Sequence, residues 1–434
     1  MKKISILLLV LILPVMLFAT GGRDMSGQHG YLRFGWWGNV ARDDRTNAVI
    51  RLYEAMNPGI TVEPEAGVAF AAYWDRLATQ TAAGNLPDVI QQDVSYIKQF
   101  NDNNQLEDLN NYARAGGAID LTNWDPGAVA AGRLGNRLAG LILATNAWGM
   151  IVDPAVLQKA NVTINDTTWT WTDYERIATQ IYQTTGVQTI PPFNVRQVVE
   201  HISRQFGSPC FNPDNKTLGI TNNQTAYNAV RDWMNMEMRL MNAGVLYDVQ
   251  DAWIQGKAMA EEPLPQGKTW NQMNWSNQLV GFQDAARRDL NYIMYPTVPG
   301  RTAHGTYYRA SMFISMTRSS QNKDLAAKFI NFFVNDLSAG RILLVERGAP
   351  VNSRVRGDIR PVVSSGDIKV LDYLDKIANY TSPADPAYPA GAGEVENPIM
   401  RNIMQEVLLG KINVDNGLTQ MVRDSNAALG RANP

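Results

Sequence analysis

The chain has 434 residues, 45% of them hydrophobic, which suffices for two lobes with separate cores and makes a single compact domain unexpected. Its 39 Lys and Arg are balanced by 41 Asp and Glu, so no net basic field exists to hold nucleic acid or an anionic membrane surface. The balance favours a neutral or mixed partner.

The N-terminal segment, MKKISILLLVLILPVMLFATGG, has two lysines, an apolar run from Ile4 to Phe18, and then small residues. The run is shorter than the roughly 20 residues that cross a bilayer, so residues 1–19 are predicted to be a secretory signal peptide cleaved after Ala19. Without its two lysines the mature chain has a formal charge of −4 instead of −2, because 37 basic residues face 41 acidic ones.

Cys210 is the only cysteine, which excludes an intrachain disulfide and a Cys-based zinc site. It also excludes a bacterial lipid anchor, which needs a Cys where Thr20 or Gly21 stands. No later apolar run is long enough to span a membrane. We therefore expect an exported, soluble protein of the periplasm that is not lipid-anchored.

The hydrophobic periodicity predicts alternating strands and helices after the signal. In chain order the pattern indicates a strand at 31–37, a helix from Asp43 or Asp44 to Asn57, a strand at 60–65, a helix around 74–81, and a strand at 87–93. This alternation is typical of a parallel sheet covered by helices. Further along, the sequence is strand-like at 138–153, helical at 170–186 and 220–243, extended at 291–300, and forms two helices within 322–348.

Catalytic, nucleotide-binding and metal-binding motifs are missing. His29, His201 and His304 are far apart, and neither HExxH nor GxSxG occurs. The segment QGKT at 266–269 lacks the first Gly of a phosphate loop, and the polar segment 101–111 lacks the Gly and Glu of an EF-hand. No cofactor or metal is expected. Acidic pairs leave one alternative open, a secreted carbohydrate-active enzyme such as a glycoside hydrolase or lyase.

Tryptophan is the residue that the chain holds in excess, with 11 copies, many next to Asn, Gln or Asp. A sugar ring stacks its CH-lined face on an aromatic ring and offers its hydroxyl edge to amides and carboxylates. Trp171 and Trp233 are expected in the core, whereas ligand binding and core packing are equally open for Trp36, Trp37, Trp148 and Trp270. Because successive residues of a strand point to opposite faces, only one of Trp36 and Trp37 is expected to face inward.

Ligands of open parallel sheets bind beyond the carboxyl ends of the strands. Three predicted strands are followed by polar or aromatic residues, namely Gly35–Asn39, Gln91–Asp93, and Asn146 with Trp148. These segments are expected to converge on one cleft.

Several segments, in this order and spacing, resemble the extracellular solute-binding proteins of ABC importers, family 1, the sugar-binding, maltose-binding-protein-like type. They cover residues 31 to about 352 and read FGWWGN, VIRLYEAMNPGITVE, YWDRLATQTAAGNLPDVIQQD, LEDLNNYA, TWTWTDYERIA, DAWIQGKAMAE, YYRASMFISMTRSSQNKDLAAKFINFFVND and RGAPVN. The resemblance implies an α/β fold of two lobes, 30–140 with 290–318 and 145–285 with 323–434, joined by hinge strands around a ligand cleft. It also implies a monomer that is not an enzyme, closes on a carbohydrate (an oligosaccharide or sugar acid) and delivers it to ABC permease subunits in the inner membrane.

The resemblance also implies which residues contact the ligand. First-lobe contacts would come from Trp36, Trp37, Asn39, Gln91, Gln92 and Asp93, with Tyr73 and Trp74 as further candidates, although a helical stripe explains Trp74 as core. Second-lobe contacts would come from Asn146, Trp148, Glu261, Trp270, Tyr308, Arg309 and Ser311. Arg309 could bind the carboxylate of an acidic sugar with two hydrogen bonds, or form a salt bridge to Asp93.

Overall fold

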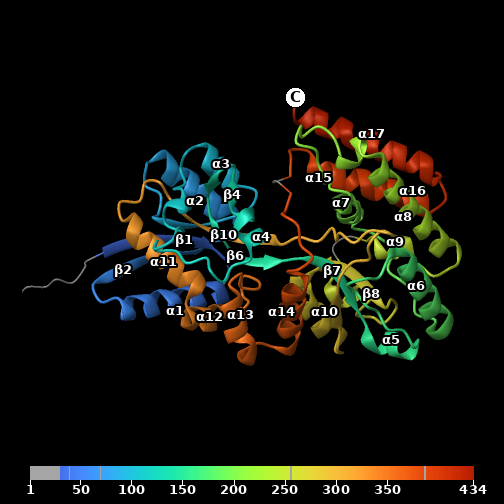
Figure 1. Cartoon of the computed structure of the whole chain (residues 1–434), viewed down its shortest axis with the longest axis horizontal. Coiled ribbons are helices and arrows are strands. Elements are labelled where there is room, and N and C mark those ends of the chain that lie inside the picture. The colour runs from blue at the N-terminus through green and yellow to red at the C-terminus, as the bar shows by residue number, and fades with distance from the viewer. Residues whose placement is uncertain (1–29, 39, 69, 255–256, 386–387) are drawn as a thin grey trace, which may run out of the picture.

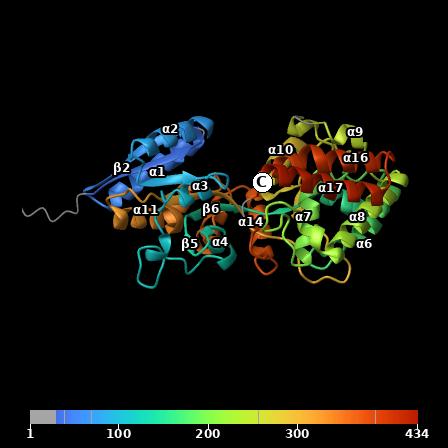
Figure 2. The same cartoon turned by 90° about the horizontal axis from the view of Figure 1, so that it is seen from above.

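The computed structural model describes residues 30–38, 40–68, 70–254, 257–385 and 388–434, which form two α/β lobes (Figure 1). Each lobe has its own hydrophobic core, one built from residues between Leu32 and Val351 and the other from residues between Trp148 and Leu429. A third, smaller cluster of buried residues, between Ala147 and Ile377, includes residues of the segments that connect the lobes. Figure 2 shows the lobes side by side along the long axis. The two-lobed fold class predicted from the sequence is confirmed. The predicted signal peptide lies outside the described residues.

The first lobe contains a five-stranded sheet in the order β2-β1-β3-β10-β6. Its strands are β1 (Gly30–Trp37), β2 (Ile60–Val68), β3 (Val89–Gln92), β6 (Leu141–Asn146) and β10 (Arg309–Met316). The predicted strands at 31–37, 60–65 and 87–93 correspond to β1, β2 and β3 and pair in parallel. The sheet as a whole is mixed, because β10 is antiparallel to both β3 and β6.

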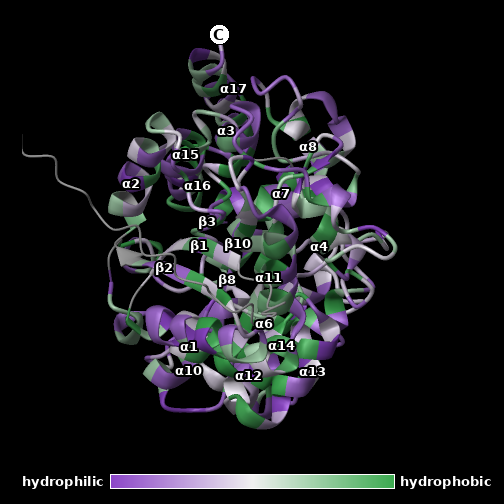
Figure 3. Ribbon diagram, turned by 90° about the vertical axis from the view of Figure 1, so that its left-hand side faces the viewer, coloured by the Kyte–Doolittle hydropathy of each residue, from purple (hydrophilic) through white to green (hydrophobic). Residues whose placement is uncertain are grey.

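Helices cover both faces of this sheet, as the view along the long axis shows (Figure 3). The helices α2 and α3 lie on one side, and α1, α11 and α12 lie on the other. Their bounds, with those of the smaller elements of this lobe, are α1 (Val40–Met56), α2 (Phe70–Ala82), α3 (Ile97–Asp102), α4 (Pro126–Ala131), β4 (Arg133–Leu134), β5 (Arg137–Leu138), α11 (Lys323–Asn335), α12 (Leu337–Leu343) and α13 (Ser353–Ile359).

The second lobe has a smaller, fully antiparallel sheet in the order β8-β7-β9. Its strands are β7 (Trp148–Val152), β8 (Asn271–Trp275) and β9 (Asn291–Ile293). Around it lie α5 (Pro154–Lys159), α6 (Trp171–Thr185), α7 (Val195–Gln205), α8 (Gln224–Asn242), α9 (Val249–Ala252), α10 (Leu279–Ala286), α14 (Ser365–Ile377), α15 (Ala392–Glu394), α16 (Arg401–Leu408) and α17 (Val414–Ala432).

The predicted strand-like segment 138–153 is two strands, because β6 belongs to the first sheet and β7 to the second. Figure 1 shows β6 running into β7 between the lobes. A second passage joins β9 to β10, and a third follows Ala349, whose carbonyl accepts a hydrogen bond from Thr145 N at 2.9 Å. The chain is therefore connected at several points around one narrow region.

The boundaries predicted for the lobes need two corrections. Residues 291–293 form β9 and pair with β7, so this segment belongs to the second lobe. Helices α11 and α12 contribute Phe329, Phe333 and Ala339 to the first-lobe core, so residues 323–343 belong to the first lobe. An apolar stripe on a helix shows that one face is buried, but not which sheet that face covers.

Among the described residues, no helix is both long and apolar enough to cross a membrane.

Candidate functional site

One edge of the first-lobe sheet collects the carboxyl ends of several strands. Strand β6 runs in the same direction as β1, β2 and β3, because β10 is antiparallel to both β3 and β6. Trp37, Gln92 and Asn146 therefore end their strands at the same edge, where Arg309 begins β10. Since β6 continues into β7 at this edge, the edge is turned toward the second lobe.

The adjacent tryptophans of β1 point to opposite faces of the sheet, as a strand requires. Trp36 is fully buried, packs 5.0 Å from the Phe34 ring, and donates from Nε1 to Asp43 Oδ1 at 2.8 Å. Trp37 points to the other face, where its ring lies 5.3 Å from Phe70. Both tryptophans belong to the first-lobe core, but Trp37, which is 9% exposed, packs against the exposed Phe70, whereas Trp36 is fully enclosed.

That cluster, which we call the first-lobe aromatic cluster, consists of Trp37, Phe70, Tyr73, Trp74 and Tyr96. The rings of Trp74 and Tyr96 are stacked 3.8 Å apart at 10°, and Phe70 contacts both edge-on. Phe70 is 43% exposed, although large apolar side chains are usually buried. Trp37, Tyr73 and Trp74 are buried in the first-lobe core, so the cluster reaches the surface through Phe70 and the half-buried Tyr96.

A buried hydrogen-bond network holds the end of β1 in place. The Trp37 carbonyl accepts from Arg42 Nη1 at 3.1 Å and from Gln91 Nε2 at 3.4 Å. The Arg347 guanidinium donates to Gln91 Oε1 at 3.0 Å and to Thr46 Oγ1 at 2.8 Å. Burial lowers the pKa of Arg347 to about 9, against the raising effect of Glu346. Gln91 thus has its partners inside the first lobe.

Two other predicted amides at this edge have unused hydrogen-bonding capacity. Gln92 is fully buried, yet neither Oε1 nor Nε2 has a partner among the described residues. Asn146 Oδ1 is likewise buried without a partner in the described part of the chain. Buried polar atoms normally have partners, so both amides are suited to a bound ligand or water. Asp93 lies just beyond Gln92 and accepts from Ser95 N at 2.9 Å.

The second lobe brings aromatic rings to the same region, which we call the second-lobe ring group: Trp148, Trp275 and Tyr388. Trp148 pairs with Trp275 across β7 and β8, with ring centroids 5.0 Å apart and planes at 80°. The Arg309 guanidinium lies 4.9 Å from the Trp275 ring and 5.8 Å from the Tyr388 ring. Arg309 therefore reaches from the first-lobe sheet onto rings of the second lobe.

Charged groups next to the ring group are paired with each other. Arg196 of α7 binds Glu200 at 2.8 Å and Glu396 at 2.7 Å, and donates to the Tyr388 hydroxyl at 3.0 Å. Burial alone raises the pKa of the Glu396 carboxyl, but Arg196, Gln197 and Arg309 outweigh it and lower that pKa. Burial also raises the pKa of Tyr388 to about 12, so its hydroxyl remains protonated at neutral pH.

Several predicted site residues lie elsewhere. Trp270 is fully buried and donates from Nε1 to Thr189 Oγ1 at 2.7 Å, and the buried Tyr308 donates to Leu374 O at 2.7 Å. Ser311 donates to Ala144 O at 2.8 Å, and the exposed Glu261 accepts from Ala258 N at 2.9 Å. These four residues, like Trp36 and Gln91, belong neither to the first-lobe aromatic cluster nor to the second-lobe ring group. Asn39 lies outside the described residues.

Sequence reasoning missed five residues at this site: Phe70, Tyr96, Trp275, Tyr388 and Glu396. Phe70 follows an Ala- and Gly-rich stretch that does not suggest a ligand contact. Tyr96 comes three residues after Asp93, beyond the predicted strand end. Trp275 reaches the site because β8 pairs with β7 and places it opposite Trp148, a long-range pairing that the sequence does not show. Tyr388 and Glu396 reach the site only through the tertiary packing of their segment on α7, which no local pattern shows.

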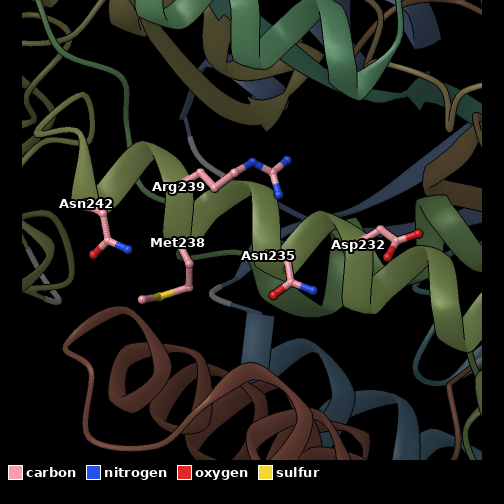
Figure 4. A pocket seen from close by; sticks show the side chains of 5 residues that line it. All are labelled: Asp232, Asn235, Met238, Arg239 and Asn242. Carbon is pink, nitrogen blue, oxygen red and sulfur yellow. The ribbon is translucent and has the colours of Figure 1, made fainter.

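Two surface hollows lie away from this region. One, of about 520 Å³, is lined by side chains of α8 alone, from Asp232 to Asn242 (Figure 4). Its Arg239 is paired with Glu175 of α6 at 2.7 Å. The other, of about 470 Å³, lies between α1 and α11 of the first lobe. Within the described residues, no group of three or more His, Cys, Asp or Glu side chains is placed to hold a metal ion.

The chain is similar to known solute-binding proteins in both sequence and fold. The family of bacterial extracellular solute-binding proteins matches residues 48–354 of this chain. A family 1 extracellular solute-binding protein from Alicyclobacillus acidocaldarius is 26% identical, with a TM-score of 0.83 over 92% of this chain and 98% of that chain.

Two further solved structures share the fold. A designed esterase is 18% identical with a TM-score of 0.78, covering 94% of this chain and all of that chain (100%). A periplasmic oligogalacturonide-binding protein from Yersinia enterocolitica is 19% identical with a TM-score of 0.75, covering 93% of this chain and 100% of that chain. The fold therefore hosts binding proteins and also tolerates an engineered catalytic site.

Proposed function

This chain belongs to the family of bacterial extracellular solute-binding proteins, and on that premise we propose that it captures a carbohydrate in the periplasm and delivers it to the permease of an ABC importer. The observation that carries the proposal is that each lobe holds paired aromatic rings beside the point where β6 passes into β7, with Trp37 and Phe70 in the first lobe and Trp148 and Trp275 in the second. Amides with unused capacity, Gln92 and Asn146, lie at the same edge.

The chemistry of the site suits a sugar. Flat aromatic rings stack on the CH-lined face of a pyranose, and amides, a guanidinium and a carboxylate bind its hydroxyl edge. The Yersinia protein of the same fold, which binds oligogalacturonide, supports a carbohydrate as the ligand class. The ligand would favour a closed arrangement of the lobes because only that arrangement offers it both surfaces.

We propose binding without catalysis. The mature chain should act as a soluble monomer, and its partners would be the sugar and the permease subunits in the inner membrane. The family consists of binding proteins, whereas the catalytic example of this fold was designed.

Isothermal titration of the mature protein against neutral and uronic oligosaccharides tests the proposal. Binding of at least one sugar with a Kd of about 1 μM, equivalent to about −8 kcal/mol, is expected. No heat with any member of the panel would contradict it. Chromatography of the same mixtures tests the alternative, since release of cleaved products would identify a carbohydrate-active enzyme.

A further inference from the structure

Arg309 has an unusual setting for a partly buried arginine. Its guanidinium lies 4.9 Å from the Trp275 ring and 5.8 Å from the Tyr388 ring, so aromatic groups cover it where water would otherwise solvate it. Within the described residues, the side chain donates no hydrogen bond and forms no ion pair within 4.0 Å. The predicted alternative of a salt bridge to Asp93 is therefore not formed.

Glu396, the carboxylate on which the charge of Arg309 acts, already has hydrogen-bond partners. Glu396 accepts from Arg196 Nε at 2.7 Å and from Gln197 Nε2 at 3.1 Å, one bond to each of its oxygens. Glu200 in turn is bound by Arg196 Nη1 at 2.8 Å. Arg196 is thus hydrogen-bonded to both carboxylates, whereas Arg309 acts on Glu396 only through its charge, without a hydrogen bond among the described residues.

An arginine in contact with aromatic rings still has its N–H groups in the plane of the guanidinium. These donors form a rigid fork that matches a carboxylate with two parallel hydrogen bonds. A neutral hydroxyl accepts one hydrogen bond from the guanidinium. A carboxylate accepts two at once and also neutralises the positive charge. The setting of Arg309 therefore favours an acceptor that is anionic and comes from outside the chain.

We propose that Arg309 binds a carboxylate of the ligand, so that the substrate is an acidic sugar containing uronic acid units. This inference rests on the proposed function and narrows its ligand class. Arg309 is well placed for such a role, because it stands at the first position of β10, opposite Asn146, where the lobes meet. The Trp275 ring beside it is partly exposed and would receive the sugar face, and the buried Trp148 packs edge-on against Trp275.

The test uses pairs of ligands that differ only in charge. Disaccharides of galacturonic, glucuronic and mannuronic acid are titrated into the mature protein, each beside its methyl ester, together with neutral disaccharides. We expect the tightest ligand to be an acid and its ester to bind at least about tenfold more weakly. A neutral sugar or an ester that binds as tightly as the best acid would overturn the inference.

Two variants of Arg309 test whether this residue causes the preference for the acid over its ester. Arg309→Met keeps an unbranched stem over Trp275 and removes the charge, so acid and ester should bind equally weakly. Arg309→Lys keeps the charge but lacks the fork, and should retain only part of the preference. Arg114→Met, on an exposed loop of the first lobe, is the matched control for the loss of one positive charge.

Melting temperatures measured alongside show whether each variant is folded. If folded Arg309→Met keeps the full preference for the acid, Arg309 is not the carboxylate site. If neutral sugars bind and acids do not, the ligand class is wrong while the proposed function stands. If no sugar of any kind binds, the proposed function itself fails.

Discussion

Trp36 and Trp37 are neighbours in sequence with different surroundings, and replacing them one at a time should separate stability from binding. Trp36→Ala removes a fully buried ring and its bond to Asp43, and should lower the free energy of unfolding by about 3–5 kcal/mol. Trp37→Ala should weaken sugar binding in addition to any loss of stability, because its ring belongs to the first-lobe aromatic cluster. Urea denaturation and titration measure the two effects. Unchanged affinity in folded Trp37→Ala would remove Trp37 from the site.

Glu237 of α8 is a buried carboxyl group with few hydrogen bonds to offset the loss of hydration. Its Oε1 accepts from Trp233 Nε1 at 3.1 Å, but Oε2 has no partner among the described residues. Burial raises the pKa of Glu237 to about 8, against an ordinary 4.5. The unfolded chain therefore loses this proton near pH 4.5 while the folded chain retains it, so stability falls as pH rises from about 4.5 to 8.

Glu237→Gln should remove that penalty, since the amide is neutral at every pH. At pH 8 the variant should be more stable than the wild type by on the order of 1–3 kcal/mol, and the gain should shrink toward pH 4.5. Thermal denaturation at both pH values measures it. Glu63→Gln, at an exposed position of β2, controls for the loss of one negative charge. Equal gains at pH 4.5 and pH 8 would show that the buried proton is not the cause.

At the scale of elements, Arg347 links the segment after α12 to the end of β1 and to β3. It donates to Thr46 of α1 and to Gln91 of β3, and Gln91 donates to the Trp37 carbonyl. Two residues later, Ala349 pairs with Thr145 of β6. Hydrogen bonds through Gln91 thus connect the segment that leaves the first lobe to the end of β1, where Trp37 lies.

Arg347→Met should lower the free energy of unfolding by about 2–4 kcal/mol, because Gln91, Thr46 and Glu346 lose a buried donor. We also expect weaker sugar binding at temperatures where the variant is folded, since the support of Trp37 loosens. Arg341→Met is the control, because Arg341 also pairs with a carboxylate, that of Asp358, but its own side chain is 62% exposed. Similar melting temperatures for the two variants would contradict a structural role for the buried network.

Elements of strong local pattern were predictable from the sequence. The turn residues and apolar stripes placed β1, α1, β2, α2, β3 and α6 close to their observed bounds. The antiparallel insertion of β10 between β3 and β6 was not predictable, because strand pairing over such a distance leaves no local periodicity. The same limit explains why residues 323–343 were assigned to the wrong lobe.

The candidate site was only partly predictable for a related reason. Trp37 and Asn146 could be placed from the rule that ligands bind beyond the carboxyl ends of strands, whereas Arg309, at the start of β10, was suggested only by the family resemblance. Trp36 and Trp270 have similar neighbours in the sequence, yet both are fully buried. The residues next to a tryptophan in sequence do not show whether its ring packs into the core or faces a ligand. Tyr388 reaches the site from the far end of the chain.

For the whole molecule, the separation of two cores predicts a change of shape on binding. A sugar held between the first-lobe aromatic cluster and the second-lobe ring group would draw the lobes together about their connecting segments. The radius of gyration from solution X-ray scattering should fall when the best-binding sugar is added, and should not change with a non-binding sugar. An unchanged radius at saturation would exclude closure as the mode of capture.

The late position of β10 in the sequence also determines when the first lobe can be completed. Residues 30–146 supply four of its five strands, but β10 separates β3 from β6 in the sheet, and it is made only after the segment 147–308 of the other lobe. Helices α11 and α12 come later still. A growing chain therefore cannot close this sheet until most of it has been synthesised. An N-terminal fragment ending before residue 309 should be readily digested by proteases, whereas the full chain is not.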